Sequence, residues 1–432
     1  MHRVVLLVPG ALFRYVWGKM KITRMFKAWP TALAMLIATA VGYAQDNQAS
    51  GDLSAARPRF IAVAPHGHLG PKNVPGIPGI DSLINFNGHY KTPGVGPTGK
   101  RTKLWYYNMV GRSPQNGGTT YINAPVVPVS LDLLNFDGNG NTLHYSVHPF
   151  ILPTLYSPVF QNSTYTSSDV PTQFVDSVQR AEFYNVMKPN WHTLLNPNLK
   201  TERTMAVPAG SYFYKLKSDG SCCEFVLIDI DEFSNLLFPS RPSDTTTPVG
   251  AAENAGDITT KDMATFLFPN TFLYFDGDPN QCCVLGFHSY DFEPGDANNG
   301  NKEKRYVLNY ASWISPGLFG GGFEDVTALS HEVSETYNDP FVASDNLHNI
   351  TPWWLSPNGN CQDDLEVGDV IEGLSQGVFP VTMNGRTYHP QNEALLQWFE
   401  FQSPSTALGG AYSYPNQNTL TALSPAEGVR CQ

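Results

Sequence analysis

The most informative stretch of the chain is residues 320–340, which have the sequence GGGFEDVTALSHEVSETYNDP. It predicts a helix that begins after a glycine-rich loop, with Asp325 as the N-cap residue. Pro340 cannot continue a helix, so the helix is expected to end near Asp339. Its apolar stripe comprises Val326, Leu329, Val333 and Tyr337. His331 and Glu335, four residues apart, lie together on a different face of this helix.

The pentapeptide His331-Glu332-Val333-Ser334-Glu335 has the spacing of the helix that holds the metal in zinc peptidases. In such a helix two ligands one turn apart bind the ion, and the glutamate after the first histidine takes a proton from the metal-bound water. This assigns metal binding to His331 and Glu335 and base catalysis to Glu332. The second ligand is a carboxylate instead of the usual histidine, which zinc accepts and which also widens the choice of metal. The alternative is a solvated acidic helix face with a capping or core histidine.

The downstream sequence carries a resemblance. His331-Glu332-x-x-Glu335-x-x-Asn338-Asp339-Pro340 is followed by Trp353-Trp354 and by Glu366-Val367-Gly368-Asp369. This order resembles a group of secreted, zincin-like proteins, among them the plant exordium and phosphate-induced proteins and many uncharacterised bacterial and fungal proteins. The resemblance covers about residues 280–372 with clear motifs and is looser over residues 106–183.

The resemblance implies three further residues at or near the site. Glu366 would be the third metal ligand, with Asp369 as its competitor or as a partner that orients it. His288, in Gly286-Phe287-His288-Ser289, would lie on a strand close to the metal helix, although a hydrogen-bonded strand histidine is the favoured interpretation. Many members carry a cysteine soon after the Gly-Asp pair, whereas Val370-Ile371 follow it here.

The N-terminus predicts export. Lys21, Arg24 and Lys27 precede a small-apolar run over residues 32–41, and Gly42-Tyr43-Ala44 supplies small residues for cleavage before Gln45. Residues 1–44 are therefore expected to be a signal peptide with extra N-terminal residues, and residues 45–65 a linker. The run is too short for a bilayer, so no membrane span is expected after cleavage and the protein is predicted to be secreted or periplasmic.

Composition favours a loop-rich, strand-rich extracellular protein. Charged residues make up 15% of the chain and aromatic residues 12%, beside 37 glycines and 34 prolines. The net charge of −11 argues against nucleic acid and anionic membranes as partners. We expect residues 66–432 to form a single two-lobed α+β domain, zincin-like and β-rich, with the active-site helix crossing a cleft. A mobile loop is expected near residues 239–260, which are poor in large apolar residues.

Local patterns place several elements of that domain. Hairpins are expected over residues 126–151, around a Gly/Asn turn, and over residues 266–290, around Asp276-Gly277-Asp278-Pro279. A helix is expected over residues 172–187.

The six cysteines predict disulfides in an oxidising compartment. They are Cys222, Cys223, Cys282, Cys283, Cys361 and Cys431. Among fifteen possible connectivities we favour pairing of one doublet with the other and of Cys361 with Cys431. A thiolate zinc site is disfavoured because the doublets lack the usual two-residue gap between ligands.

These patterns together predict a secreted metal-dependent hydrolase, a metallopeptidase acting on a peptide or protein substrate, with Zn²⁺ as the favoured divalent ion. The alternative is a secreted binding or signalling protein whose metal site is structural or degenerate. Residues 94–101 mimic a phosphate-binding loop, but Arg101 stands where Ser or Thr is required. A glycosidase pair of carboxylates stays open, because its members need only be near in space. No oligomeric state is predicted.

Overall fold

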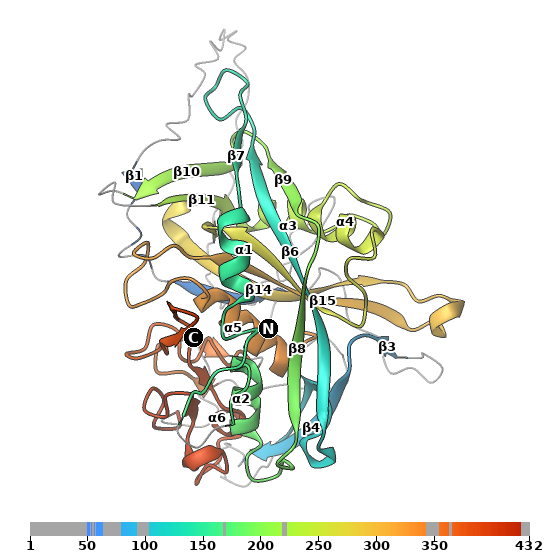
Figure 1. Ribbon diagram of the computed structural model, residues 1–432, viewed down its shortest axis with the longest axis vertical. Helices are drawn as coiled ribbons and strands as arrows, with labels where there is room; N and C mark the ends of the chain where they lie inside the picture. The colour runs from blue at the N-terminus through green and yellow to red at the C-terminus, as the bar shows by residue number, and fades with distance from the viewer. Residues whose placement is uncertain are drawn as a thin grey trace, which may run out of the picture.

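The computed structural model describes residues 50–51, 53, 56, 58–63, 79–92, 103–166, 170–217, 223–342, 354–362 and 365–424 (Figure 1). The predicted signal peptide, Trp353, Cys222 and Cys431 lie outside these residues. Within them, no helix is long and apolar enough to cross a membrane.

The protein is a mixed α/β, β-rich structure built around one large curled sheet that resembles half a barrel (Figure 1). Its main strand order is β1-β10-β11-β13-β14-β15-β12-β6-β7, and β2, β3, β8 and β9 pair beside this path. The strands of this sheet are β1 Ser50–Gly51, β2 Arg59–Val63, β3 Ile80–Asp81, β6 Thr119–Leu133, β7 Leu143–Tyr145, β8 His192–Leu199, β9 Arg203–Val207, β10 Tyr212–Lys217, β11 Glu224–Asp229, β12 Met263–Pro269, β13 Thr271–Tyr274, β14 Cys282–Glu293 and β15 Glu303–Trp313.

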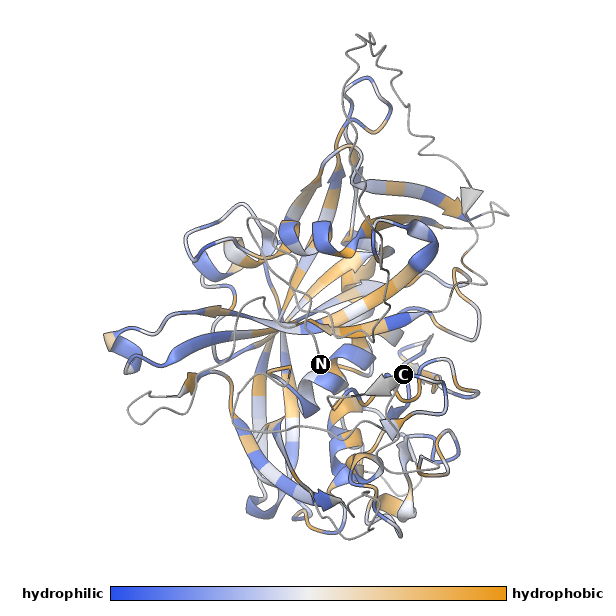
Figure 2. Ribbon diagram, turned by 180° about the vertical axis from the view of Figure 1, so that it is seen from behind, coloured by the Kyte–Doolittle hydropathy of each residue, from blue (hydrophilic) through white to orange (hydrophobic). Residues whose placement is uncertain are grey.

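Both faces of the central sheet are covered. Neighbouring residues on one strand enter different cores: Leu267 joins one apolar cluster and Phe266 the other, as expected when successive side chains point to opposite faces. Such strands are nearly continuous in apolar residues, and all seven residues of β12 are buried. Figure 2 shows apolar residues gathered along these central strands.

Six helices occur in the described part of the chain: α1 His148–Leu155, α2 Phe174–Glu182, α3 Ile230–Leu237, α4 Pro248–Asn254, α5 Thr327–Asn338 and α6 Leu396–Phe399. Helix α5 packs against β14 and β15 and contacts α2. Helices α3 and α4 supply Phe233 and Val249 to the core on the other face. The helix that the sequence predicts to bind a metal is therefore the one that packs across the two central strands.

The remaining strands form small two-stranded sheets: β4 Asn85–Thr92 with β5 Lys103–Val110, β16 Trp354–Leu355 with β17 Cys361–Gln362, β18 Val381–Met383 with β19 Arg386–Tyr388, and β20 Glu393–Ala394 with β21 Ser413–Tyr414. After β19 the chain returns to α5. Thr327 donates its hydroxyl to the carbonyl of His389, and the backbone N–H of Gln391 donates to the Ser330 hydroxyl. The C-terminal segment thus packs against α5.

Several local predictions are confirmed and several need correction. The predicted hairpins exist in part, as the antiparallel pairs β6–β7 and β13–β14. Residues 148–155 form α1 instead of continuing a strand, and residues 266–269 belong to β12, which pairs with β6 and β15 and not with β14. Residues 239–260 are not a loop throughout, because α4 lies within them with Val249 and Ala252 fully buried. The predicted helix over residues 172–187 is α2, which is shorter at both ends.

Asp325 is not the N-cap of α5. The N-cap residue is Val326, and no side chain caps this helix. Asp325 has a left-handed backbone with φ of 46°, and its carboxylate accepts hydrogen bonds from the backbone N–H groups of Val326 and His389. Its role is to tie the C-terminal segment to the start of α5.

The predicted pairing between the cysteine doublets is wrong for Cys282 and Cys283. These adjacent residues form a disulfide with each other across a cis peptide bond at the start of β14. Neither is therefore left to bond to the other doublet. Cys223 is also disulfide-bonded.

Candidate metal centre

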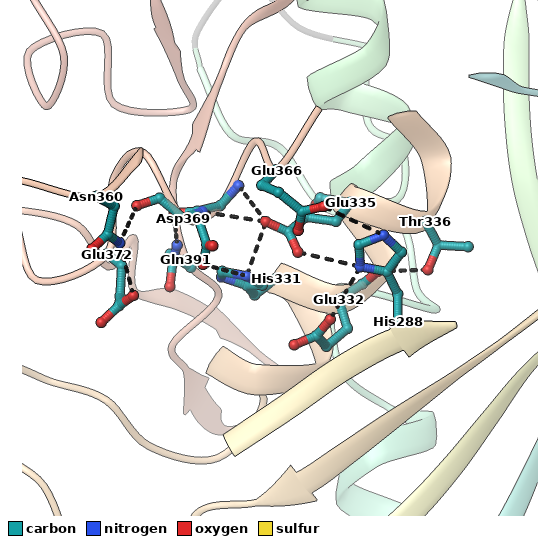
Figure 3. Close-up of polar contacts among 12 residues, drawn as sticks. His288, His331, Glu332, Glu335, Thr336, Asn360, Glu366, Asp369, Glu372 and Gln391 are labelled. Atoms are coloured by element: carbon teal, nitrogen blue, oxygen red, sulfur yellow. Dashed lines mark hydrogen bonds and ion pairs between the residues drawn. The ribbon is translucent and has the colours of Figure 1, made fainter. Parts of the chain in front are cut away.

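Helix α5 and strand β14 face each other at the centre of the molecule, and the predicted chemistry lies between them (Figure 3). His331, Glu332 and Glu335 are fully buried, which places them in the interior. Gly286 on β14 allows the close approach of the helix, because a Cβ atom there would lie 2.7 Å from both Cγ and Oε1 of Glu332. Gly286, two residues before His288, therefore leaves space for the side chain of Glu332, the predicted base.

The imidazole of His331 is held between two surfaces. Phe60 of β2 stacks on one side, with the ring centroids 3.7 Å apart and the planes 23° from parallel. Gly368 of the Glu-Val-Gly-Asp turn lies against the ring, where a Cβ atom would overlap Nδ1 and Cε1. The orientation of the ring is fixed by packing on both sides.

Glu335 is the central acid of the site. Its Oε1 accepts hydrogen bonds from the backbone N–H groups of Gly368, at 3.1 Å, and Asp369, at 3.2 Å, and lies 3.1 Å from Nε2 of His331. Its Oε2 lies 3.4 Å from Nδ1 of His288. One carboxylate thus joins the helix, the turn and the strand (Figure 3).

His288 belongs to this site. Its Nδ1 lies 3.6 Å from Oε2 of Glu332, and its Nε2 lies 3.8 Å from Oε1 of Glu366. Asp369 approaches from the other side, with Oδ1 3.6 Å from Nε2 of His331. The interpretation of His288 as a hydrogen-bonded strand histidine is wrong, because neither ring nitrogen makes a hydrogen bond to the described residues.

Two compact groups of metal-ligand atoms therefore meet at Glu335. One comprises His288, Glu335 and Glu366, and the other comprises His331, Glu332 and Glu335. All the residues predicted from the motif and the turn come together, but His331, Glu335 and Glu366 do not form one compact group. Glu366 lies beside His288, and Asp369 beside His331.

The donor set fits a divalent cation. Both ring nitrogens of His288 and of His331, both carboxylate oxygens of Glu332, and Oε2 of Glu335 are buried and make no hydrogen bond to the described residues. Leaving so many polar atoms buried and unsatisfied is costly, and buried charges are normally paired or bound to metal. Imidazole and carboxylate are ligands that zinc accepts.

The charges at the site are strongly coupled. Burial lowers the pKa of His288, but the Glu332 and Glu335 carboxylates outweigh it and raise that pKa to about 10. Burial also lowers the pKa of His331, but the carboxylates of Glu335, Glu332 and Asp369 together outweigh burial and raise that pKa well above its usual value. Burial raises the pKa of Glu332 to about 7, whereas the two histidines overcome burial at Glu335 and lower its pKa. A cation would take the place of protons that these groups otherwise share.

The site is supported by further residues, which the sequence motifs did not indicate. Gln391 donates its side-chain N–H to the carbonyl of Gly368 at 2.7 Å, and Asn358 donates to the carbonyl of Asp369 at 2.6 Å. Glu393 is fully buried, and its pKa is raised well above the usual value by burial. Nothing in the local sequence around Gln391 or Glu393 marks them, because they reach the site only through the return of the C-terminal segment.

The candidate ligands other than Asp369 are buried. Every residue of α5 is buried, and among the predicted ligands Asp369 has the most exposed side chain, at 13%.

A hollow of about 430 Å³ lies elsewhere, lined by residues of β4, β5, α2 and α6 and containing none of the predicted ligands.

A third group of possible ligands lies at the start of α5. Nδ1 of His389 lies 2.8 Å from Oδ2 of Asp325 and 3.2 Å from Oε1 of Glu324. Both contacts use the same nitrogen, so this group forms an ion pair that holds residue 389 against the helix.

No protein-family model, curated protein sequence or solved structure matches this chain.

Proposed function

We propose that this protein is an exported metal-dependent hydrolase, with Zn²⁺ as the ion and a peptide or protein as the substrate. The observation that carries the proposal is the convergence of His288, His331, Glu335 and Glu366 around Glu332 in a buried site, where the ring nitrogens of both histidines and both carboxylate oxygens of Glu332 make no hydrogen bond to the described residues. The resemblance to secreted zincin-like proteins and the predicted signal peptide support the same proposal from the sequence.

Each residue has a distinct role in this proposal. His331, Glu335 and His288 bind the ion, and Glu366 and Asp369 complete or orient the ligand set. A divalent ion bound there would polarise a water or a substrate carbonyl as a Lewis acid. Glu332 supplies the base: its carboxylate lies beside the ligands, and burial raises its pKa to about 7, a value at which it can both accept and return a proton near neutral pH.

A second candidate function is a binding protein that the ion stabilises. One observation favours it: the ligands and the proposed base are buried, whereas a catalytic metal keeps a position open to substrate. Both proposals require the metal, and they differ in the role of Glu332.

The test separates the two functions. The mature chain from Gln45, with the variants His331→Ala and Glu332→Gln, is assayed for bound metal by mass spectrometry and for hydrolysis of a broad peptide pool. The hydrolase predicts metal in wild type, its loss in His331→Ala, and metal without turnover in Glu332→Gln. Glu224→Gln, which removes an exposed carboxylate on β11, is the matched control and should match wild type. Metal binding without peptide cleavage by wild type selects the structural candidate, and wild type without stoichiometric metal refutes both.

A further inference from the structure

The hollow of about 430 Å³ away from the metal centre contains acidic and amide side chains that are not fully hydrogen-bonded. Glu182 of α2, together with Gln397 and Glu400 of the α6 region, contributes to its lining. Its volume lies within the range of small-molecule sites. We infer that this hollow binds an organic cation that carries N–H donors, a guanidinium or a primary ammonium group. This inference is independent of the proposed hydrolase function.

Glu182 is the deepest of these acids, with 1% of its surface exposed. Its Oε1 is already used, since it accepts hydrogen bonds from the side chain of Asn338 at 3.0 Å and from the backbone N–H of Leu396 at 3.1 Å. Its Oε2 has no partner among the described residues. A buried carboxylate oxygen without a donor is costly, and a ligand N–H would satisfy it.

Gln397 repeats this pattern. Its side-chain N–H donates to the backbone carbonyl of Glu182 at 2.7 Å, which fixes the amide and leaves Oε1 as an acceptor. That oxygen is also buried without a hydrogen bond to the described residues. Oε2 of Glu182 and Oε1 of Gln397 are therefore two acceptors on adjacent elements. A ligand with several N–H donors, such as a guanidinium or ammonium group, can satisfy both, whereas an anion cannot.

Glu400 adds a second carboxyl to the lining. It is half-buried, and Gln402 accompanies it in lining both this hollow and a neighbouring one that also includes Lys91. The described lining of the larger hollow contains two carboxyl groups, one imidazole (His89) and neither lysine nor arginine. Burial raises the pKa of Glu182 to about 8 and that of Glu400 to about 7, as expected for acids that lack a compensating cation, so a bound cation would displace the proton that Glu182 otherwise holds at neutral pH.

Aromatic rings form the apolar side of the hollow. Phe86, Tyr107 and Phe183 line it, and their ring centroids lie 5.8 to 6.3 Å from one another. Cations are attracted to the faces of such rings, and combined aromatic and carboxylate walls are the usual recognition surface for organic cations. A metal ion would gain nothing from the rings, so the lining favours an organic cation.

The test compares two probes of equal size on the mature chain by isothermal titration calorimetry. The probes are n-butylguanidinium and its neutral isostere n-butylurea. We expect saturable binding of the guanidinium, at least tenfold weaker binding of the urea, and at least tenfold weaker guanidinium binding in Glu182→Gln and in Glu400→Gln. Glu224→Gln again removes one carboxylate outside the hollow and should bind as wild type does.

Because Glu182 is buried, its variant is first checked for cooperative unfolding, and Glu400→Gln carries the test if Glu182→Gln does not fold. Equal affinity for the two probes, absence of saturable guanidinium binding by wild type, or identical affinity in Glu400→Gln and Glu224→Gln would each overturn the inference.

Discussion

Gly368 lies so close to the imidazole of His331 that no larger residue fits between the turn and the ring. The same glycine donates its backbone N–H to Glu335 and accepts a hydrogen bond from Gln391 through its carbonyl. The glycine of the Glu-Val-Gly-Asp turn is thus explained by contact with the first histidine of the metal helix. Its backbone is not left-handed, so space is the reason for glycine at this position.

Gly368→Ala should therefore disrupt the site by steric overlap. The added methyl group must displace the His331 ring from between the turn and Phe60, and overpacking of this kind costs about 1–3 kcal/mol or more. We expect the variant to unfold at lower denaturant concentration and to lose metal measured by mass spectrometry. Gly410→Ala is the comparison, because its Cβ meets nothing and it carries only the ~1 kcal/mol cost of a left-handed alanine. Equal metal content in the two variants would contradict this account of Gly368.

His288→Ala should weaken metal binding as severely as His331→Ala does. Oε2 of Glu335 faces His288 and Oε1 faces His331, so the loss of either imidazole removes a ligand. A loss of at least ~100-fold in zinc affinity is expected, above the effect of removing a residue that only orients a ligand. Competition with a fluorescent zinc chelator measures it, with His144→Ala, an exposed histidine, as the control. Wild-type affinity in His288→Ala combined with loss in Glu366→Ala would restore the ligand set predicted from the sequence.

The buried acid Glu182 should make the protein less stable as the pH rises. Its pKa is about 8 in the folded protein and about 4.3 in an unfolded chain, so the folded state binds more protons between these values. Its contribution to the free energy of unfolding is full below pH ~4 and is lost as the pH rises to about 8, at up to ~1.4 kcal/mol per pH unit. Glu182→Gln should flatten the dependence on pH, measured by urea unfolding at pH 5, 6, 7 and 8. Parallel curves for the variant and wild type would show that Glu182 is ionised in the folded protein.

The ion pair between His389 and Asp325 should stabilise the protein in mild acid. Asp325 raises the pKa of His389 more than burial lowers it, so this contribution is full below pH ~6.5 and is lost as the pH rises through the raised value. We expect His389→Gln to cost about 1–2 kcal/mol at pH 5.5 and much less at pH 9, by thermal unfolding. His144, with its side chain 55% exposed, makes a contact of equal length to Asp132, and His144→Gln should cost under ~1 kcal/mol. A similar loss of stability in His389→Gln and His144→Gln would show that the less exposed pair of His389 and Asp325 contributes no more than an exposed pair.

The sequence predicted the helix of residues 327–338 and its chemistry because both depend on local spacing. His331, Glu332 and Glu335 are placed by helical periodicity alone, and Pro340 marks the end of the helix. The turn at Glu366 was found only through its motif, and the structure brings it to the same site.

Features that depend on long-range contacts were predicted only in part. The resemblance placed His288 on a strand near the helix of residues 327–338, but its position among the carboxylates follows from the register of β14 beside β15. Gln391 and Glu393 were not predicted, because they reach the site only when the chain returns after β19. The buried helix α4 lacked a strong apolar pattern, since small residues such as Gly250 and Ala252 fill its packed face. The disulfide between Cys282 and Cys283 was missed because pairing of one cysteine doublet with the other was favoured over a bond between adjacent residues.

All twelve residues of α5 are buried, and this burial bears on how fast a bound ion could leave the protein. Backbone amides within a fully enclosed helix exchange hydrogen with solvent when the surrounding structure opens. An ion held between α5 and β14 would leave through the same opening, so its residence time would follow the opening rate of the protein and not the intrinsic lability of its bonds to imidazole and carboxylate. Such a centre would keep its ion for long periods against a strong external chelator. Under conditions in which exposed amides exchange faster than the structure recloses, deuterium uptake by the amides of residues 331–335 would report the same opening rate.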